Sequence, residues 1–433
     1  MTGPEGSASI GRMSADVIER HLAEAQRAKQ AGRPDLARPH LEAVLAIDAE
    51  EPFARNALGA DALAANAAAT AARHFEISCR REPSERTFWI NLATARRALG
   101  DAEAERAALE SALSLDQTDL LALIRLAELH ERESERNLAA DRWSAVIGLS
   151  STIEEPSPEF RQLLDRARAF IEGQRGLRAN AVDGALADDL AAATVRDARR
   201  MRAAADTWLG RRTIYVNHCE GLHYPFLPAD EFFDREHFPW LERLEEHTAA
   251  IAAEATALLA TPDARLEPYI SMPEGTPANK WSALDRSLDW GALHLWKEGV
   301  RYDETCARAP KTAALVESLP MCRIQGRAPN VFFSILKAGS VIPPHTGTTN
   351  VRSVVHLPLI VPPGCGFRVG GETREWRVGE AFAFDDTIEH EAWNRSGEDR
   401  AVLILDAWNP HLSEHERTMV CRLYEAADRQ RES

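Results

Sequence analysis

Residues 331–360 read VFFSILKAGSVIPPHTGTTNVRSVVHLPLI, and this stretch decides the fold of the second half of the chain. It begins as an apolar strand, turns at Lys-Ala-Gly, returns through two prolines to His345, and then alternates polar and apolar residues. Other short strands flank it: DWGALHLWKEGVR before it, and GFRVGGETREWRVGEAFAFDD and AVLILDAWNP after it. Many short strands with glycine and proline turns predict a double-sheet jelly roll of the cupin kind.

His345 is a candidate metal ligand because it stands at the mouth of a strand. Mononuclear iron oxygenases usually add an Asp or Glu two residues later, a position that Gly347 occupies here. His390, in FDDTIEHEAWN between two predicted strands, could converge on the same ion. Taken alone, each could instead be a histidine whose hydrogen bonds are made in the core or at the surface, and a cupin-like isomerase or zinc enzyme is a further reading of the pair. The same alternatives apply to the other histidines of this region: His294, His356 and His411.

A longer pattern resembles a known family. PHTGTTNVRSVVHLPLIVP, followed by GETREWRVGEAFAFDDTIEHEAWNRSGEDRAVLILDAWNP, is similar to the aspartyl/asparaginyl β-hydroxylases over residues 225–415. The most specific motifs are PHTGxTNxR…H and FDDxxEHExWN. The resemblance implies a jelly-roll dioxygenase that uses Fe(II), 2-oxoglutarate and O2 to hydroxylate an unactivated carbon. It also implies a metal held by two histidines without a carboxylate, which makes Gly347 an expected residue.

The resemblance assigns a role to each matching residue. His345 and His390 match the two metal ligands, and both are therefore expected to be catalytic. Arg400 matches the arginine that pairs with the distal carboxylate of 2-oxoglutarate, for which a guanidinium fork is well shaped. Ser334 matches a hydroxyl that contacts the same carboxylate, and His356 matches a histidine that contacts the metal-side carboxylate. Trp296 matches an aromatic residue that lines the cosubstrate pocket, and Arg352 matches a substrate-binding arginine.

The chain departs from the family at one substrate position. Peptide-directed members resemble N-x-R-x-R-x-H, whereas Val354 stands here in place of the second arginine. The reaction type is therefore better defined than the substrate, for which an amino acid, a peptide or protein side chain, a lipid head group and a natural-product intermediate stay open. The acids near the second histidine are expected to orient it or close its turn: Asp385, Asp386, Glu389 and Glu391.

The first third of the chain repeats every 34 residues. Small residues recur at one series of positions: Ala25, Gly59, Ala93 and Ala127. Large apolar residues recur at another: Leu41, Phe75, Leu109 and Trp143. Turn-forming residues recur at a third: Gly32, Asn66 and Gly100. A small residue at a helix crossing, with large residues beside it, resembles the tetratricopeptide repeat. This predicts an α-solenoid over residues 18–150 whose concave face binds a protein partner or orders the attached domain.

The rest of the chain completes a three-part organisation. Residues 151–210 are expected to be a helical linker, and residues 211–433 the jelly-roll domain. The net charge of −16 argues against nucleic acid or an anionic membrane as the main partner. We expect a cytoplasmic location because we find no signal peptide or apolar span, and because the six scattered cysteines read as reduced thiols. The alternative to an enzyme is a non-catalytic repeat scaffold carrying a degenerate jelly roll.

Overall fold

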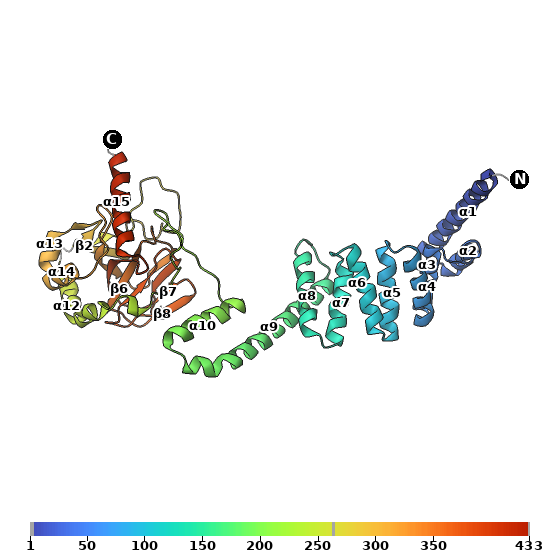
Figure 1. Cartoon of the computed structure of the whole chain (residues 1–433), viewed down its shortest axis with the longest axis horizontal. Helices are drawn as coiled ribbons and strands as arrows, with labels where there is room; N and C mark the ends of the chain where they lie inside the picture. Colours follow the sequence, from blue (N-terminus) through green and yellow to red (C-terminus); the bar gives the residue numbers. More distant parts are fainter. Residues whose placement is uncertain (1–3, 262–264, 432–433) are drawn as a thin grey trace. The chain divides into compact units, whose positions relative to one another are not determined.

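The computed structural model describes residues 4–261 and 265–431. It divides into two compact units, Met1–Ala187 and Asp188–Ser433 (Figure 1). Within the described residues, no helix is both long enough and apolar enough to cross a membrane.

The first unit is built from pairs of helices. They are α1 (Pro4–Gln30), α2 (Pro34–Ile47), α3 (Pro52–Ala64), α4 (Ala68–Arg81), α5 (Arg86–Leu99), α6 (Ala102–Leu115), α7 (Leu120–Arg132) and α8 (Arg136–Ser150). The second helices of the pairs begin at residues 34, 68, 102 and 136, which reproduces the 34-residue period of the sequence. The predicted helical repeats are therefore confirmed.

The recurring residues explain the pairing. Phe75 is fully buried against the α3–α4 crossing, where a Cβ built on Gly59 would lie 2.6 Å from the Phe75 ring. The other members of the small and large series are buried to at least 98%: Ala25, Ala93, Ala127, Leu41, Leu109 and Trp143. The turn residues Gly32, Asn66 and Gly100 all have positive φ, and Ser134 adopts it at the fourth turn.

The predicted linker is helical. It contains α9 (Pro158–Ala192) and α10 (Val195–Trp208), and α10 begins where the Thr194 hydroxyl accepts a hydrogen bond from the Asp197 amide. The boundary between the two compact units falls near the end of α9, so α10 belongs to the second unit.

The second unit contains two antiparallel sheets. The larger has the order β1-β2-β4-β11-β6-β9, with β3 beside β2, and the smaller has the order β5-β10-β7-β8. From β4 onward the strands are distributed between the sheets as in a jelly roll, which agrees with the predicted α + β fold. The strands are β1 (Glu267–Pro268), β2 (Trp290–Lys297), β3 (Val300–Arg301), β4 (Val331–Leu336), β5 (Val341–His345), β6 (Arg352–Ile360), β7 (Cys365–Val369), β8 (Glu372–Glu375), β9 (Phe382–Phe384), β10 (His390–Asn394) and β11 (Arg400–Trp408).

Two apolar layers hold this unit together. One lies between the sheets and includes Leu336, Phe367 and Val402. The other lies between the larger sheet and helices α11, α12 and α14, and includes Leu244, Leu315 and Leu403. The helical elements of the unit, besides α10, are η1 (Arg235–His237), α11 (Leu241–Glu246), α12 (Thr248–Leu259), α13 (Asp303–Arg308), α14 (Pro310–Glu317) and α15 (Glu414–Arg431).

Candidate active site

A cavity of about 500 Å³ is lined by residues of both sheets of the second unit. His345 ends β5 and His390 begins β10, and the two residues are direct cross-strand partners. Their ring centroids are 4.0 Å apart, and both rings line the cavity. Antiparallel pairing thus brings together two histidines that are far apart in sequence.

The backbone fixes the tautomer of both rings. Nδ1 of His345 donates to the carbonyl of Pro343 at 2.8 Å, and Nδ1 of His390 donates to the carbonyl of Ile388 at 3.0 Å. Because a carbonyl only accepts, the proton sits on Nδ1 and the lone pair on Nε2. Burial lowers the pKa of His345 to about 4 and that of His390 well below its usual value. Two neutral imidazoles with free lone pairs are a donor set suited to Fe(II).

Arg400, at the start of β11, lines the same cavity, and its guanidinium is a buried positive charge. Its side chain is 2% exposed, and neither Nε nor Nη1 has a hydrogen-bond partner. Burial lowers its pKa to about 10, so it stays charged at neutral pH. The Trp376 ring lies 4.9 Å from the guanidinium carbon. A buried guanidinium with two unused donors fits a carboxylate-bearing cosubstrate.

Two further expected contacts lie on the cavity wall. Ser334 on β4 is fully buried and accepts a hydrogen bond from the Trp290 indole at 3.1 Å, which leaves its own proton available. His356 on β6 is 7% exposed, and its buried Nδ1 has no partner. Burial, and then the charge of Arg400, lowers the pKa of His356 well below its usual value.

The space beside Gly347 is already filled by a carboxylate. A Cβ built on Gly347 would lie 2.1 Å from Oδ2 of Asp386, and the Gly347 amide donates to the Asp386 carbonyl at 2.5 Å. A side chain at position 347 would therefore displace Asp386. Oδ1 of Asp386 is buried without a partner, and burial raises the pKa of this carboxyl to about 7.

The other acids near His390 have structural contacts. Asp385 accepts hydrogen bonds from the amide and hydroxyl of Thr387 at 3.0 and 2.6 Å, which closes the turn before the histidine. Glu389 and Glu391 both pair with Arg368, at 2.9 and 2.5 Å. These contacts leave Asp386 as the acid of this group that lines the cavity.

Arg352 and Val354 line the cavity from β6. Nη1 of Arg352 pairs with Asp406 at 3.1 Å, and Nη2 donates to the Thr348 hydroxyl at 3.2 Å. The Asp406 carboxylate raises the pKa of Arg352, while its buried Nε has no partner. Val354 is 8% exposed and gives this wall an apolar surface where the family pattern has an arginine.

Trp296 does not line the cavity, in contrast to the expectation from the resemblance. The register of β2 against β4 shifts between His294 and Trp296, and this irregularity interrupts strict alternation. Trp296 instead packs in the core between the larger sheet and its helices, with the Arg301 guanidinium 5.6 Å from its ring.

Other aromatic residues line the cavity and were not anticipated from the sequence: Tyr269, Trp281, Trp290 and Phe384. Trp281 meets the His345 ring edge-on at 5.0 Å. His294 also faces the cavity, with a buried Nδ1 that has no partner, and burial lowers its pKa to about 4. The tryptophans were visible in the sequence, but nothing local indicated which of them face the cavity.

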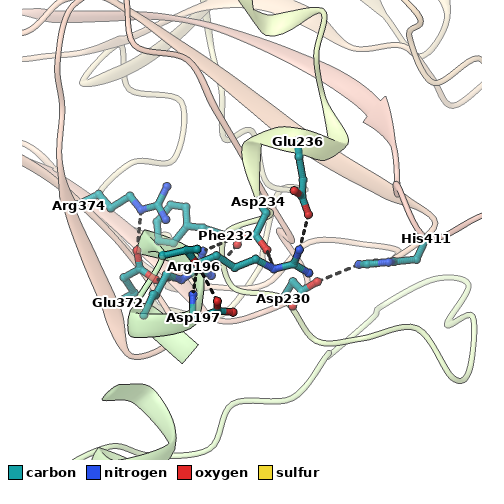
Figure 2. A network of polar contacts seen from close by, with 11 residues as sticks. Arg196, Asp197, Asp230, Phe232, Asp234, Glu236, Glu372, Arg374 and His411 are labelled. Atoms are coloured by element: carbon teal, nitrogen blue, oxygen red, sulfur yellow. Dashed lines mark hydrogen bonds and ion pairs between the residues drawn. The ribbon is translucent and has the colours of Figure 1, made fainter. Parts of the chain in front are cut away.

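A second group of potential ligands lies elsewhere. Asp234, Glu236 and His237 place ligand atoms within 4.8 Å of one another, the one group of three or more that the described residues contain. Figure 2 shows the carboxylates of Asp234 and Glu236 directed at the guanidinium of Arg196, and Asp234 pairs with it at 2.8 Å. His411, in the same view, pairs with Asp230 at 2.9 Å. Arg196 pairs with both acids and Arg199 pairs with Asp234, so two arginines already balance the two carboxylates and the group needs no cation.

The fold and the cavity define a jelly-roll protein in which a pair of neutral histidines, one buried and one partly buried, lies in the same cavity as a buried arginine. Residues 245–410 match the family described as Aspartyl/Asparaginyl beta-hydroxylase. The second unit is therefore similar to the aspartyl/asparaginyl β-hydroxylases over this range, and the resemblance read from the motifs is confirmed.

Several named relatives match parts of the chain. Human aspartyl/asparaginyl beta-hydroxylase is 39% identical over 133 residues, 30% of this chain and 17% of the relative. Human aspartate beta-hydroxylase domain-containing protein 2 is 33% identical over 47% of this chain and 53% of the relative. The ornithine lipid ester-linked acyl 2-hydroxylase of Rhizobium tropici is 29% identical over 44% of this chain and 64% of the relative. The matches thus span less than two thirds of each relative.

Among solved structures, the APC/C hetero-tetramer Cut9-Hcn1 aligns with 35% of this chain and 29% of its own, at 24% identity and a TM-score of 0.31. A MamA protein aligns with 40% of this chain and 96% of its own, at 15% identity and the same TM-score. The repeat architecture described above rests on the helices themselves.

Proposed function

We propose that the chain is an Fe(II)- and 2-oxoglutarate-dependent dioxygenase that hydroxylates an unactivated carbon. The observation that carries this proposal is the composition of one cavity: two neutral imidazoles side by side, and a buried guanidinium with two unused donors. A non-catalytic scaffold with a degenerate jelly roll would have no need for a buried arginine whose Nε and Nη1 donate no hydrogen bond within the protein. Hydroxylase names among the relatives support the same reaction class.

The residues divide the binding task between metal and cosubstrate. His345 and His390 would hold the iron through Nε2. Arg400 would take the distal carboxylate of 2-oxoglutarate with the help of the Ser334 hydroxyl, and His356 would contact the metal-side carboxylate. When bound together, Fe(II), 2-oxoglutarate and O2 supply the oxidising chemistry, in which 2-oxoglutarate is converted to succinate and CO2 and the substrate gains one oxygen atom.

The protein then contributes orientation and exclusion of water. The carbonyls of Pro343 and Ile388 hold both imidazoles in one tautomer, so neither ring has to reorient before it binds metal. The Trp281 ring lies 5.0 Å from His345 and the Phe384 ring 5.2 Å from His390, so each imidazole has an aromatic neighbour that covers part of it. This apolar surround limits side reactions of the oxidising centre.

The substrate is proposed to be an amino acid, or a side chain of a peptide or protein. Arg352 lines the cavity and would contact the substrate, and Val354 beside it replaces the second arginine of the family pattern. The repeats are proposed to act as a protein-interaction arm. We also propose a cytoplasmic location, since all six cysteines are unpaired, which fits a reducing compartment.

The test is a measurement of succinate formed from 2-oxoglutarate by the full chain with Fe(II). Candidate substrates, including material retained by the repeat unit, are screened by mass spectrometry for a gain of one oxygen. His345→Ala and His390→Ala should each abolish iron retention, and Arg400→Ala should raise the required 2-oxoglutarate concentration steeply. His411→Ala, whose ring pairs with Asp230, is the matched control. Wild-type protein that retains no iron and forms no succinate would refute the proposal.

A further inference from the structure

A segment outside the family match lies against the candidate metal centre. Asn217–Tyr224, which we call the strap, precedes residues 245–410 and has neither helix nor strand. Glu220, within it, lines the cavity. The strap contacts two loops: residues 346–351, which follow His345, and residues 385–389, which precede His390.

The first loop is attached by a series of hydrogen bonds. The Gly221 amide donates to the Thr348 carbonyl at 2.8 Å, and the Thr349 hydroxyl donates to the Leu222 carbonyl at 2.6 Å. The Asn350 side chain makes a pair of bonds with the Tyr224 backbone, accepting from its amide at 2.7 Å and donating to its carbonyl at 2.9 Å. Three consecutive loop residues, beginning three positions after His345, are thus tied to the strap.

The approach of Gly221 to the loop is tighter than an ordinary side-chain contact. A Cβ built on Gly221 would lie 3.0 Å from the Thr348 carbonyl oxygen. Because that atom belongs to the backbone, a methyl group here would push the strap and the loop apart. Glycine at this position therefore permits the contact.

The second loop is held through Asn217 and His218. Nδ2 of Asn217 donates to Oδ2 of Asp385 at 2.7 Å and to the Thr387 hydroxyl at 2.9 Å, and the His218 amide donates to the Thr387 carbonyl at 2.8 Å. The next carbonyl along the chain, that of Ile388, accepts from Nδ1 of His390. A continuous path of hydrogen bonds and two peptide units thus joins the strap to the histidine ring.

We propose that the strap is a positioning element of the metal centre, which holds the loops of His345 and His390 at the separation that one shared ion requires. The proposal rests on the proposed function, since it assumes that the two histidines bind the ion. Because the protein would supply only two ligands, displacement of one loop would remove half of the protein's bonds to the metal. Outer groups that orient metal ligands typically contribute about 10–100-fold in affinity.

The test uses the full chain and two variants that act on different loops. Asn217→Ala removes the two side-chain bonds to residues 385 and 387, and Gly221→Ala crowds the contact with the Thr348 carbonyl, which has to move by a few tenths of an ångström. Val216→Ala is the matched control, because Val216 adjoins the strap and is 55% exposed. Mn(II) affinity is measured by electron paramagnetic resonance of the free ion, the visible spectrum of Co(II) reports the ligand geometry, and thermal unfolding without metal reports the fold.

We expect Asn217→Ala and Gly221→Ala to weaken Mn(II) binding by about 10-fold or more and to change the Co(II) bands. Val216→Ala should behave as the wild type does. The proposal is overturned if both variants fold and bind Mn(II) with unchanged affinity and an unchanged Co(II) spectrum. A variant that fails to fold leaves the other to decide, since each acts on a separate loop. Wild-type protein that binds neither ion would instead refute the proposed function, and this result is distinguishable because it needs no variant.

Discussion

Arg400→Met should change stability and cosubstrate affinity in opposite directions. Burial lowers the pKa of this arginine from 12.5 to about 10, a difference that corresponds to about 3 kcal/mol against the charged form in the folded protein without ligand. Methionine fills a similar volume without a charge, while loss of the contact with Trp376 removes about 1 kcal/mol. The variant without ligand should therefore be more stable by about 1–3 kcal/mol.

The affinity for 2-oxoglutarate should fall steeply in the same variant. A hydrogen bond from a charged donor contributes about 1.5–3 kcal/mol, and Arg400 has two unused donors. Loss of both should weaken binding at least about 100-fold. This sets Arg400 apart from residues that serve the fold alone, whose replacement would lower stability.

The assay pairs urea unfolding of the ligand-free protein with calorimetric titration of 2-oxoglutarate in the presence of Mn(II). Arg374→Met is the matched control, because Arg374 is about one-third exposed and pairs with Glu372 at 2.7 Å. The control should retain cosubstrate affinity. An Arg400→Met variant that is less stable than the wild type and binds 2-oxoglutarate normally would show that the guanidinium serves the fold.

The other predictions concern packing and pH. Gly347→Asp should destabilise the protein by about 2 kcal/mol or more in urea unfolding, because its side chain must displace Asp386, and Asp386→Ala in the same chain should restore most of the loss; unchanged stability of the single variant would contradict this. Gly59→Ala should lower the stability by about 1–3 kcal/mol through overpacking against Phe75. A Cβ at Gly148 meets no atom within 4 Å, so Gly148→Ala should stabilise its helix by about 0.5–1 kcal/mol. Thermal circular dichroism measures both, and equal effects would refute the packing argument. Since His294 has a pKa of about 4 when folded and 6.5 when unfolded, the unfolded state binds more protons between these values, so stability should fall by up to about 3 kcal/mol as the pH drops from 6.5 to 4. Replacement of His294 by Phe should remove this contribution and leave that of the other buried histidines, whose pKa values burial also lowers. A slope unchanged in that variant would assign the acid sensitivity to those other groups.

The repeat unit was largely predictable from sequence because each residue of the pattern has a local cause. The 34-residue spacing, the small residues at crossings and the glycines at turns all report contacts within one or two helices. Ser134 was missed, since serine seldom signals positive φ, yet it occupies the fourth turn.

The jelly roll and its histidines were found through motifs, whereas features that depend on distant contacts were not. The irregularity in β2 that directs Trp296 into the core has no local signal. The same holds for the contact of Asn217 with Thr387, which joins residues 170 positions apart. These segments meet only in the folded chain, and neither sequence has a periodic pattern that predicts the other as its contact.

The pairing of Arg352 with Asp406 has a consequence for molecular recognition. An arginine with a built-in counter-ion presents directional donors to the cavity while contributing little long-range attraction. Selectivity there would come from hydrogen-bond geometry and from the apolar surface of Val354, and association would depend only weakly on ionic strength.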